Sequence, residues 1–235
     1  MSGVILGVVF DLDGTLTGPG AIDFARIRRR IGMPEPGSIM RWIEENTESD
    51  VDAEARYAIV QEEEDLGLAR MAPGAGLATL VGALVERGST LHTAICTRNS
   101  VDALEAFDAL LERCGHPRSR ELFHVQITRD HHSAYLGRVI EDKPSHEPAH
   151  EIVRAWGFEE RFAPHVAHEH DAAIHPELLF VGDNIDDCHA GRRAGFRTGL
   201  VHHGQTRDPN DPIRQAVDTT FVDLADVACA LRRAH

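Results

Sequence analysis

The sequence lacks the features that would place it in a specialised class of protein. Its 235 residues contain no apolar run long enough to span a membrane, and Met1-Ser2-Gly3 leads into the first apolar stretch without the basic segment of a secretory signal. The four cysteines form no close pair, so they indicate no disulfide framework. Cys96 lies in an apolar run, where we expect a buried, reduced thiol and no nucleophile. We therefore expect a cytoplasmic protein with no membrane partner.

Positive charge is also scarce. Lys and Arg together number 24 against 38 Asp and Glu, and the formal net charge is −14 with His neutral. Such a chain lacks the basic surface that nucleic-acid binding requires. Its overall field does not attract an anionic substrate either, so a phosphate group would have to be drawn by local groups such as a metal ion, a lysine or backbone N–H groups.

In other respects the composition is ordinary for a soluble globular protein, with 42% hydrophobic and 26% charged residues. Its length allows one large domain, or a core with a smaller lobe. From residue 77 onward, helical and strand patterns alternate, which predicts an α/β fold with a parallel sheet between two layers of helices. The expected strands are 4–10, 91–96, 123–127, 178–181, 198–201 and 219–222, and the expected helices are 77–86, 101–114, 148–156, 187–194 and 224–233.

Residues 18–72 interrupt this alternation. The pattern there predicts three helices, at about 21–31, 38–45 and 52–68, and no strand, before Pro73-Gly74-Ala75-Gly76 marks a boundary. We therefore expect a helical insertion between the first strand and the rest of an α/β domain that comprises residues 1–17 and 73–235. The arginines at 26–30 have two interpretations: a solvated helix face, or a group that holds a substrate anion.

Two carboxylates follow the first strand directly, in the stretch Asp11-Leu12-Asp13-Gly14-Thr15. Ligands of open α/β sheets bind just beyond the carboxyl ends of the strands. Carboxylates this close repel one another unless a cation lies near them, and Mg²⁺ is the cation that suits such oxygen ligands. Gly14 would allow the sharp turn after the strand. The alternative is an ordinary strand-to-loop turn, where Asp and Gly are common.

Polar groups also follow three later strands. Each group has a structural alternative: Thr and Asn are frequent helix caps, an isolated lysine is usually a surface residue, and acids at a helix start suit the helix dipole. The acids four residues apart in the third group can share one helix face. The groups are Thr97-Arg98-Asn99, Lys143-Pro144, and Gly182-Asp183 with Asp186 and Asp187.

Together and in this order, these motifs resemble those of the haloacid dehalogenase-like (HAD) hydrolase superfamily, in particular its capped, phosphoglycolate phosphatase-like members. The resemblance implies a Rossmann-like three-layer core, with residues 18–72 as a small helical type-1 cap that closes over the site. Two positions depart from the usual pattern, because Asn184 replaces a Ser or Thr and His146 replaces a second Pro. The matching motifs are Asp11-Leu12-Asp13-Gly14-Thr15, Thr97, Lys143-Pro144 and Gly182-Asp183 with Asp187.

The resemblance also implies a role for each matched residue. Asp11 would be the nucleophile, and Asp13 the general acid and then the base. Mg²⁺ would be held by Asp11, the backbone carbonyl of Asp13, and Asp183, with Asp187 in support; spacing favours Asp187 over Asp186. Catalysis would also use Thr97 and Lys143. The groups expected to bind the phosphorylated substrate are Gly14, Thr15, Thr97, Arg98, Asn99 and Lys143.

The expected function is hydrolysis of a small phosphorylated metabolite, such as phosphoglycolate or a sugar phosphate, through an aspartyl-phosphate. Asp13 argues against dehalogenation, because the dehalogenases of the family lack this second acid. Two alternatives stay open: a phosphomutase, and a non-catalytic regulatory protein that binds phosphate. Monomer and homodimer are equally compatible with the sequence. The His-rich segment 165–175 matches no metal motif, and we expect a solvated loop.

Overall fold

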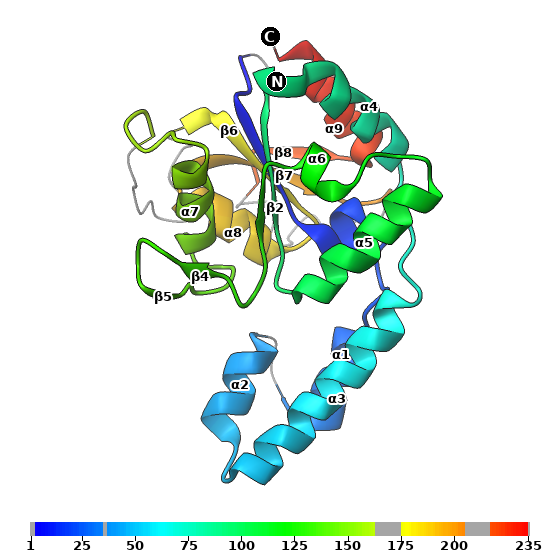
Figure 1. The fold of residues 1–235 in the computed structure, drawn as a ribbon, viewed down its shortest axis with the longest axis vertical. Coiled ribbons are helices and arrows are strands. Elements are labelled where there is room, and N and C mark those ends of the chain that lie inside the picture. The colour runs from blue at the N-terminus through cyan, green and yellow to red at the C-terminus, as the bar shows by residue number, and fades with distance from the viewer. Residues whose placement is uncertain (1–2, 35–36, 163–174, 205–216, 235) are drawn as a thin grey trace. The chain divides into compact units, whose positions relative to one another are not determined.

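The computed structural model describes residues 3–34, 37–162, 175–204 and 217–234 (Figure 1). Two compact units are present: Met1–Pro19 with Pro73–His235, and Gly20–Ala72. The first contains a six-stranded parallel sheet in the order β3-β2-β1-β6-β7-β8. The strands are β1 Gly7–Phe10, β2 His92–Cys96, β3 Val125–Ile127, β6 His175–Gly182, β7 Phe196–Val201 and β8 Thr219–Phe221.

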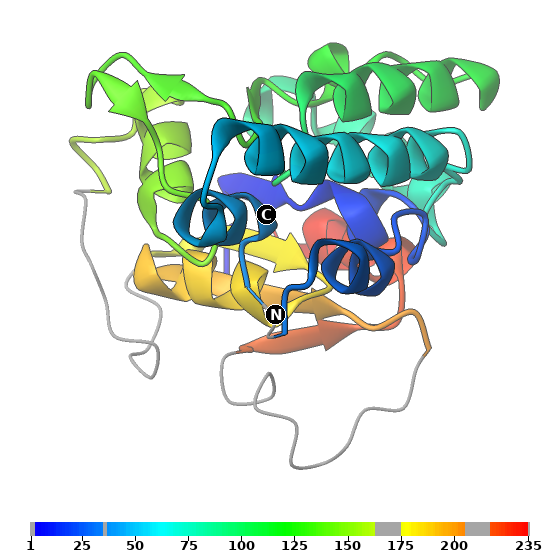
Figure 2. The ribbon, with the colours of Figure 1, turned by 90° about the horizontal axis from the view of Figure 1, so that it is seen from below.

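Strand β1 lies at the centre of this sheet because its side chains are apolar on both faces. Val8, Val9 and Phe10 are all fully buried. Successive residues of a strand point to opposite faces, so this burial requires helices on both sides. Figures 1 and 2 show this arrangement, with α5 and α8 on opposite sides of the strands. The helices of this unit are α4 Leu77–Arg87, α5 Val101–Arg113, α6 Ser119–Leu122, α7 Glu147–Ala155, α8 Ile185–Arg193 and α9 Leu224–Arg233.

The expected fold class is confirmed, and the differences from the sequence prediction lie in short elements. The stretch between β3 and Lys143 contains a small antiparallel hairpin, β4 His132–Ser133 and β5 Arg138–Val139, where the sequence predicted only a loop. Strands of two residues carry no readable alternation, which is why the pattern missed them. The first strand also begins at Gly7, later than expected.

The helical unit comprises α1 Phe24–Ile31, α2 Ile39–Asn46 and α3 Asp50–Leu68. Each helix is preceded by a residue whose side chain accepts a hydrogen bond from the backbone N–H three residues later. This bond satisfies one of the N–H groups that have no partner within the helix at its N-terminus. These caps are Asp23, Ser38 and Ser49. The unit has its own small core, formed by Ile22, Ile27, Ile31, Met33, Ile43 and Val60.

Two of the arginines at 26–30 have a role that neither sequence interpretation included. The Nε atom of Arg26 lies 2.9 Å from Oε1 of Glu63, and Nη1 of Arg30 lies 2.7 Å from the same oxygen. Glu63 is only 1% exposed. A buried carboxylate is costly unless it is paired, so these arginines compensate an acid within the helical unit itself.

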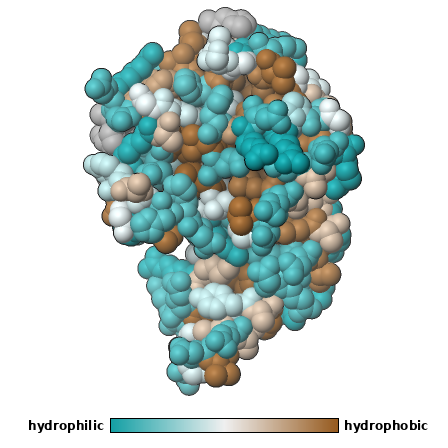
Figure 3. Space-filling model, viewed as in Figure 1, coloured by the Kyte–Doolittle hydropathy of each residue, from teal (hydrophilic) through white to brown (hydrophobic). Residues whose placement is uncertain are grey.

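No helix among the described residues is long and apolar enough to cross a membrane. On the face shown in Figure 3, hydrophobic residues are scattered among hydrophilic ones. All four cysteines are free thiols, with Cys96 and Cys188 buried and Cys114 and Cys229 exposed. Of the His-rich segment 165–175, residues 165–174 lie outside the described residues, and His175 begins β6.

Arg87 at the end of α4 ties together three parts of the core. Its Nη1 donates to the carbonyls of Leu231 at 2.6 Å and Ala234 at 3.0 Å, and its Nη2 donates to the carbonyl of Ile5 at 3.1 Å. Arg87 is buried. It therefore supplies the donors that the C-terminal end of α9 lacks.

We expect Arg87→Met to lower the free energy of unfolding by roughly 2–4 kcal/mol, because three buried carbonyls lose their donors. Urea denaturation measures this directly. The matched control is Arg232→Met, which removes an exposed arginine paired with Glu86 and should have a much smaller effect. Equal losses in the two variants would contradict this account of Arg87.

Candidate functional site

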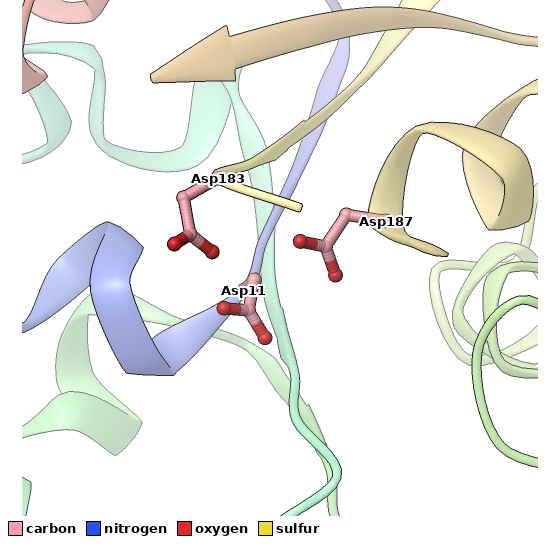
Figure 4. Close-up of side chains that lie close together, drawn as sticks. All are labelled: Asp11, Asp183 and Asp187. Atoms are coloured by element: carbon pink, nitrogen blue, oxygen red, sulfur yellow. The ribbon is translucent and has the colours of Figure 1, made fainter. Parts of the chain in front are cut away.

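Three aspartates converge at the carboxyl edge of the sheet. One carboxylate oxygen from each of Asp11, Asp183 and Asp187 lies within 4.8 Å of the others, and Figure 4 shows the three side chains pointing toward one another. Asp11 follows β1, Asp183 follows β6, and Asp187 lies in the first turn of α8. Within the described part of the chain, they form the only group of three such side chains placed to hold a metal ion.

The sheet register and two glycines explain this convergence. Phe10 of β1 pairs with Val181 of β6, so both chains leave the sheet at the same level. Gly14 has φ +77°, and a Cβ there would lie 2.4 Å from Oδ2 of Asp183. A Cβ on Gly182 would lie 2.3 Å from the Cβ of Asp187. Larger residues at either glycine would therefore displace a carboxylate of the cluster.

Lys143 is the cation of this cluster. Its ammonium donates to Oδ1 of Asp11 at 2.5 Å, to Oδ1 of Asp187 at 2.6 Å and to the carbonyl oxygen of Cys96 at 2.8 Å. Burial alone would lower the pKa of Lys143, but the charges of the two aspartates outweigh it and raise the pKa above its ordinary value. Lys143 is also the chain's only lysine, a compositional signal that sequence reasoning missed.

The negative charge of the three aspartates exceeds the positive charge of the single ammonium group of Lys143. Burial raises the pKa of Asp11 to about 6, although Lys143 acts in the opposite direction. Burial, and then the charges of Asp11 and Asp187, raises the pKa of Asp183 to about 8. Ionised together, three carboxylates and one ammonium leave two negative charges uncompensated. Hard oxygen ligands with this excess charge fit a divalent cation such as Mg²⁺.

Asp13 lies in a different environment from Asp11. Its Oδ2 accepts a hydrogen bond from Nδ2 of Asn99 at 2.5 Å and a longer one from Oγ1 of Thr97 at 3.5 Å. Its carboxylate is not part of the metal-type cluster, which is compatible with the expectation that only its backbone carbonyl would contact a metal. The two acids are separated because β1 ends at Phe10, so Asp13 lies in the turn Leu12–Leu16, which also contains the left-handed Gly14.

The other expected substrate-binding residues surround these acids. Thr97 is 3% exposed and Thr15 fully buried, and the hydroxyl of Thr15 has no hydrogen-bond partner among the described residues. Arg98 donates through Nη1 to Oδ2 of Asp186 at 2.7 Å. Asp186 therefore pairs with an arginine, whereas its neighbour Asp187 contacts Lys143.

Two further residues, His203 and Cys96, contact groups of the site although neither belongs to its motifs. Nε2 of His203 makes a short contact with the carbonyl oxygen of Gly14, and His203 has an uncommon φ of +50°. The available signal was its position just after β7, at the same edge of the sheet. Cys96 is excluded as a nucleophile, because burial raises the pKa of its thiol to about 12.

Asp183→Asn should stabilise the metal-free protein at high pH. Because the pKa of Asp183 is raised by folding, its ionised form destabilises the folded state, and this penalty grows from about pH 4 to pH 8. In EDTA above pH 8, we expect the free energy of unfolding of the variant to exceed that of the wild type by roughly 2 kcal/mol. This difference should vanish near pH 4. The measurement is urea denaturation at several pH values. Asp186→Asn, outside the cluster, is the control and should show no such gain.

Lys143→Arg should destabilise the protein although it keeps the charge. A planar guanidinium cannot direct three donors at the closely spaced acceptors that the compact ammonium contacts. We expect the free energy of unfolding to fall by roughly 3 kcal/mol, similar to the loss when a buried ion pair is broken. Arg113→Lys, an exposed change of the reverse kind, should have little effect on the same denaturation curve. A fully stable Lys143→Arg protein would show that geometry is unimportant here.

The chain is similar to known hydrolases in sequence. A HAD-hydrolase-like family model matches residues 159–227. A haloacid dehalogenase-like hydrolase domain-containing protein from Arabidopsis thaliana is 28% identical over 216 residues, which cover 87% of this chain and 74% of the relative.

Solved structures extend the likeness to nearly the whole fold. A hydrolase from Pseudomonas syringae matches with a TM-score of 0.65 and 20% identity, covering 97% of this chain and 98% of that one. A predicted phosphoglycolate phosphatase from Haemophilus somnus matches with a TM-score of 0.61 and 18% identity, covering 96% of this chain and 97% of that one. The family model and the sequence relative confirm the motif-based resemblance of this chain to the HAD-like hydrolases, and the solved structures show that the fold is shared.

Proposed function

We propose that the protein is a Mg²⁺-dependent phosphatase that hydrolyses a small phosphorylated metabolite through an aspartyl-phosphate on Asp11. One observation carries the proposal: Asp11 and Asp13, two residues apart, have different partners. Among the described residues, Asp11 contacts an ammonium in a buried acidic cluster, whereas Asp13 accepts hydrogen bonds from the neutral side chains of Thr97 and Asn99. Two carboxylates in different environments can take different roles in one reaction.

The residues present fit the metal. Asp11, Asp183 and the backbone carbonyl of Asp13 would hold Mg²⁺, with Asp187 in support. When bound, the ion would neutralise charge on the phosphoryl oxygens. Lys143 would offset further charge and fix the orientation of Asp11. Transfer of a phosphoryl group depends mainly on such positioning and neutralisation.

The reaction then proceeds in two displacements at phosphorus. A carboxylate oxygen of Asp11 bonds to phosphorus while the ester P–O bond breaks, and Asp13 gives its proton to the departing alkoxide. In the second step, Asp13 takes a proton from a water molecule whose oxygen bonds to phosphorus. The acyl phosphate P–O bond breaks, which releases inorganic phosphate and restores the Asp11 carboxylate.

We further propose that the helical unit Gly20–Ala72 is the cap of this enzyme and selects its substrate. Its place in the chain supports this, because it follows β1 and precedes the remainder of the core. The name of the Haemophilus somnus protein suggests phosphoglycolate as one substrate to test; sugar phosphates are the other class. The hydroxyl of Thr97 would contact the transferred phosphoryl group. The other groups proposed to contact the substrate are Gly14, Thr15, Arg98, Asn99 and Lys143.

Phosphate release from p-nitrophenyl phosphate and a metabolite panel, with Mg²⁺ or EDTA, tests the proposal. We expect metal-dependent release that Asp11→Asn reduces by about 10³-fold or more, because no nucleophilic carboxylate remains. Asp102→Asn, an exposed acid in the first turn of α5, should retain full activity.

Two results would overturn the phosphatase assignment. An isomerised phosphosugar without free phosphate would indicate a mutase. Mg²⁺ binding by the folded protein, without turnover of any ester, would indicate a regulatory protein that binds phosphate.

A further inference from the structure

An ion pair links the residues that follow the two strands on either side of β1. Arg98 follows β2, and Asp186 lies in the first turn of α8, after β6. Nη1 of Arg98 donates to Oδ2 of Asp186 at 2.7 Å. In the sheet, β1 lies between β2 and β6. The pair therefore lies across the carboxyl end of β1, the strand end that Asp11 follows.

The charges of two cluster acids also act on Arg98. Burial lowers the pKa of the guanidinium, but the charges of Asp186, Asp187 and Asp11 outweigh burial and raise the pKa above its ordinary value. Asp187 and Asp11 belong to the acidic cluster. Among the described residues, the hydrogen bond to Asp186 is nevertheless the one that the Arg98 side chain makes. Arg98 thus lies beside the nucleophile without a bond to it.

Most donors of this guanidinium have no partner among the described residues. A guanidinium carries five N–H groups, and Asp186 accepts from one of its nitrogens. The Arg98 side chain is 35% exposed, so part of it is open to solvent. The planar fork of a guanidinium fits two oxygens of one phosphoryl group. Arg98 therefore has the donors and the place to contact the group that Asp11 attacks.

We propose that Asp186 is a positioning residue that holds Arg98 against the transferred phosphoryl group, where the guanidinium binds two of its nonbridging oxygens. The inference rests on the proposed function. Asp186 keeps the guanidinium away from Asp11 and Asp187, whose charges attract it, so that the nucleophile stays available to phosphorus. The phosphoryl group is the expected contact because Arg98 directly follows Thr97, whose hydroxyl is proposed to contact the same group.

Two binding measurements separate this role from a structural one. Isothermal titration calorimetry gives Kd for inorganic phosphate in the presence of Mg²⁺, and Kd for Mg²⁺ alone. In Asp186→Ala we expect Kd for phosphate to rise about 10-fold, because the released guanidinium moves toward the cluster acids. Kd for Mg²⁺ should change by less than about 3-fold, since neither Asp186 nor Arg98 is a proposed metal ligand. A disturbed α8, which also carries Asp187, would weaken both ligands equally and overturn the inference.

A second variant separates position from charge. Asp186→Asn removes the same negative charge as Asp186→Ala, but its amide oxygen can still accept from Nη1 of Arg98. We therefore expect Kd for phosphate to rise by less than about 3-fold. An equal rise in the two variants would show that the charge of Asp186 matters and its hold on Arg98 does not.

Kinetics identify the group that Arg98 contacts. In Arg98→Ala, kcat/KM should fall by about 10²-fold for p-nitrophenyl phosphate and for esters that carry a second anionic group. The factor is the same because all these substrates share the phosphoryl group. A fall confined to esters with a second anionic group would place Arg98 on another part of the substrate and overturn the proposal. Glu86→Ala, which breaks the exposed pair with Arg232, is the matched control and should keep full activity.

A double variant ties Asp186 to Arg98. Because Asp186 acts through the guanidinium, Asp186→Ala should cause no further loss in an Arg98→Ala background, and additive losses would contradict the inference. A wild type that binds phosphate but hydrolyses no ester would overturn the proposed function, while the titrations still decide the role of Asp186. Should Asp186→Ala fail to fold, Asp186→Ser, too short to reach Nη1, must show the same rise in Kd for phosphate.

Discussion

The site depends on one ammonium group. Lys143 joins the ends of three elements: Asp11 after β1, the Cys96 carbonyl at the end of β2, and Asp187 in α8. An ammonium has three hydrogens, and here it has three acceptors. The other 23 of the 24 basic residues are arginines, so the chain departs from arginine only where a compact point charge is required.

Lys143 also explains how Asp187, in the motif Gly182-Asp183 with Asp187, can have a structural role and a functional role at once. Oδ2 of Asp187 accepts the backbone N–H of Asn184 and so caps α8, while its Oδ1 accepts from Lys143. The same carboxylate therefore satisfies the helix start and compensates the ammonium. Asp183 lies at the same sheet edge, and burial beside two further acids raises its pKa. The excess negative charge follows from the fold itself.

The gathering of Asp11, Asp183 and Lys143 was predictable, because parallel strands bring the residues after their carboxyl ends to one edge. The directions of the side chains could not be predicted in the same way. Asn99 and Asp13 are 86 positions apart, and Gly14 and His203 are 189 apart. No local pattern encodes such contacts. Composition held a further signal, since an isolated lysine looks like a surface residue until it is recognised as the only one in the chain.

The separation of Asp11 from Asp13 is a consequence of the turn that joins them. Residues i and i+2 of a continuing strand would point to the same side, and both carboxylates would then compete for Lys143. Strand β1 ends at Phe10, and Asp13 lies in the turn over Leu12–Leu16 that contains the left-handed Gly14. That acid instead meets the donors of Thr97 and Asn99. A nucleophile must stay ionised and an acid must hold a proton. In the proposed reaction the ammonium of Lys143 would favour the ionised state of Asp11, and the neutral donors described at Asp13 leave that acid in a different environment.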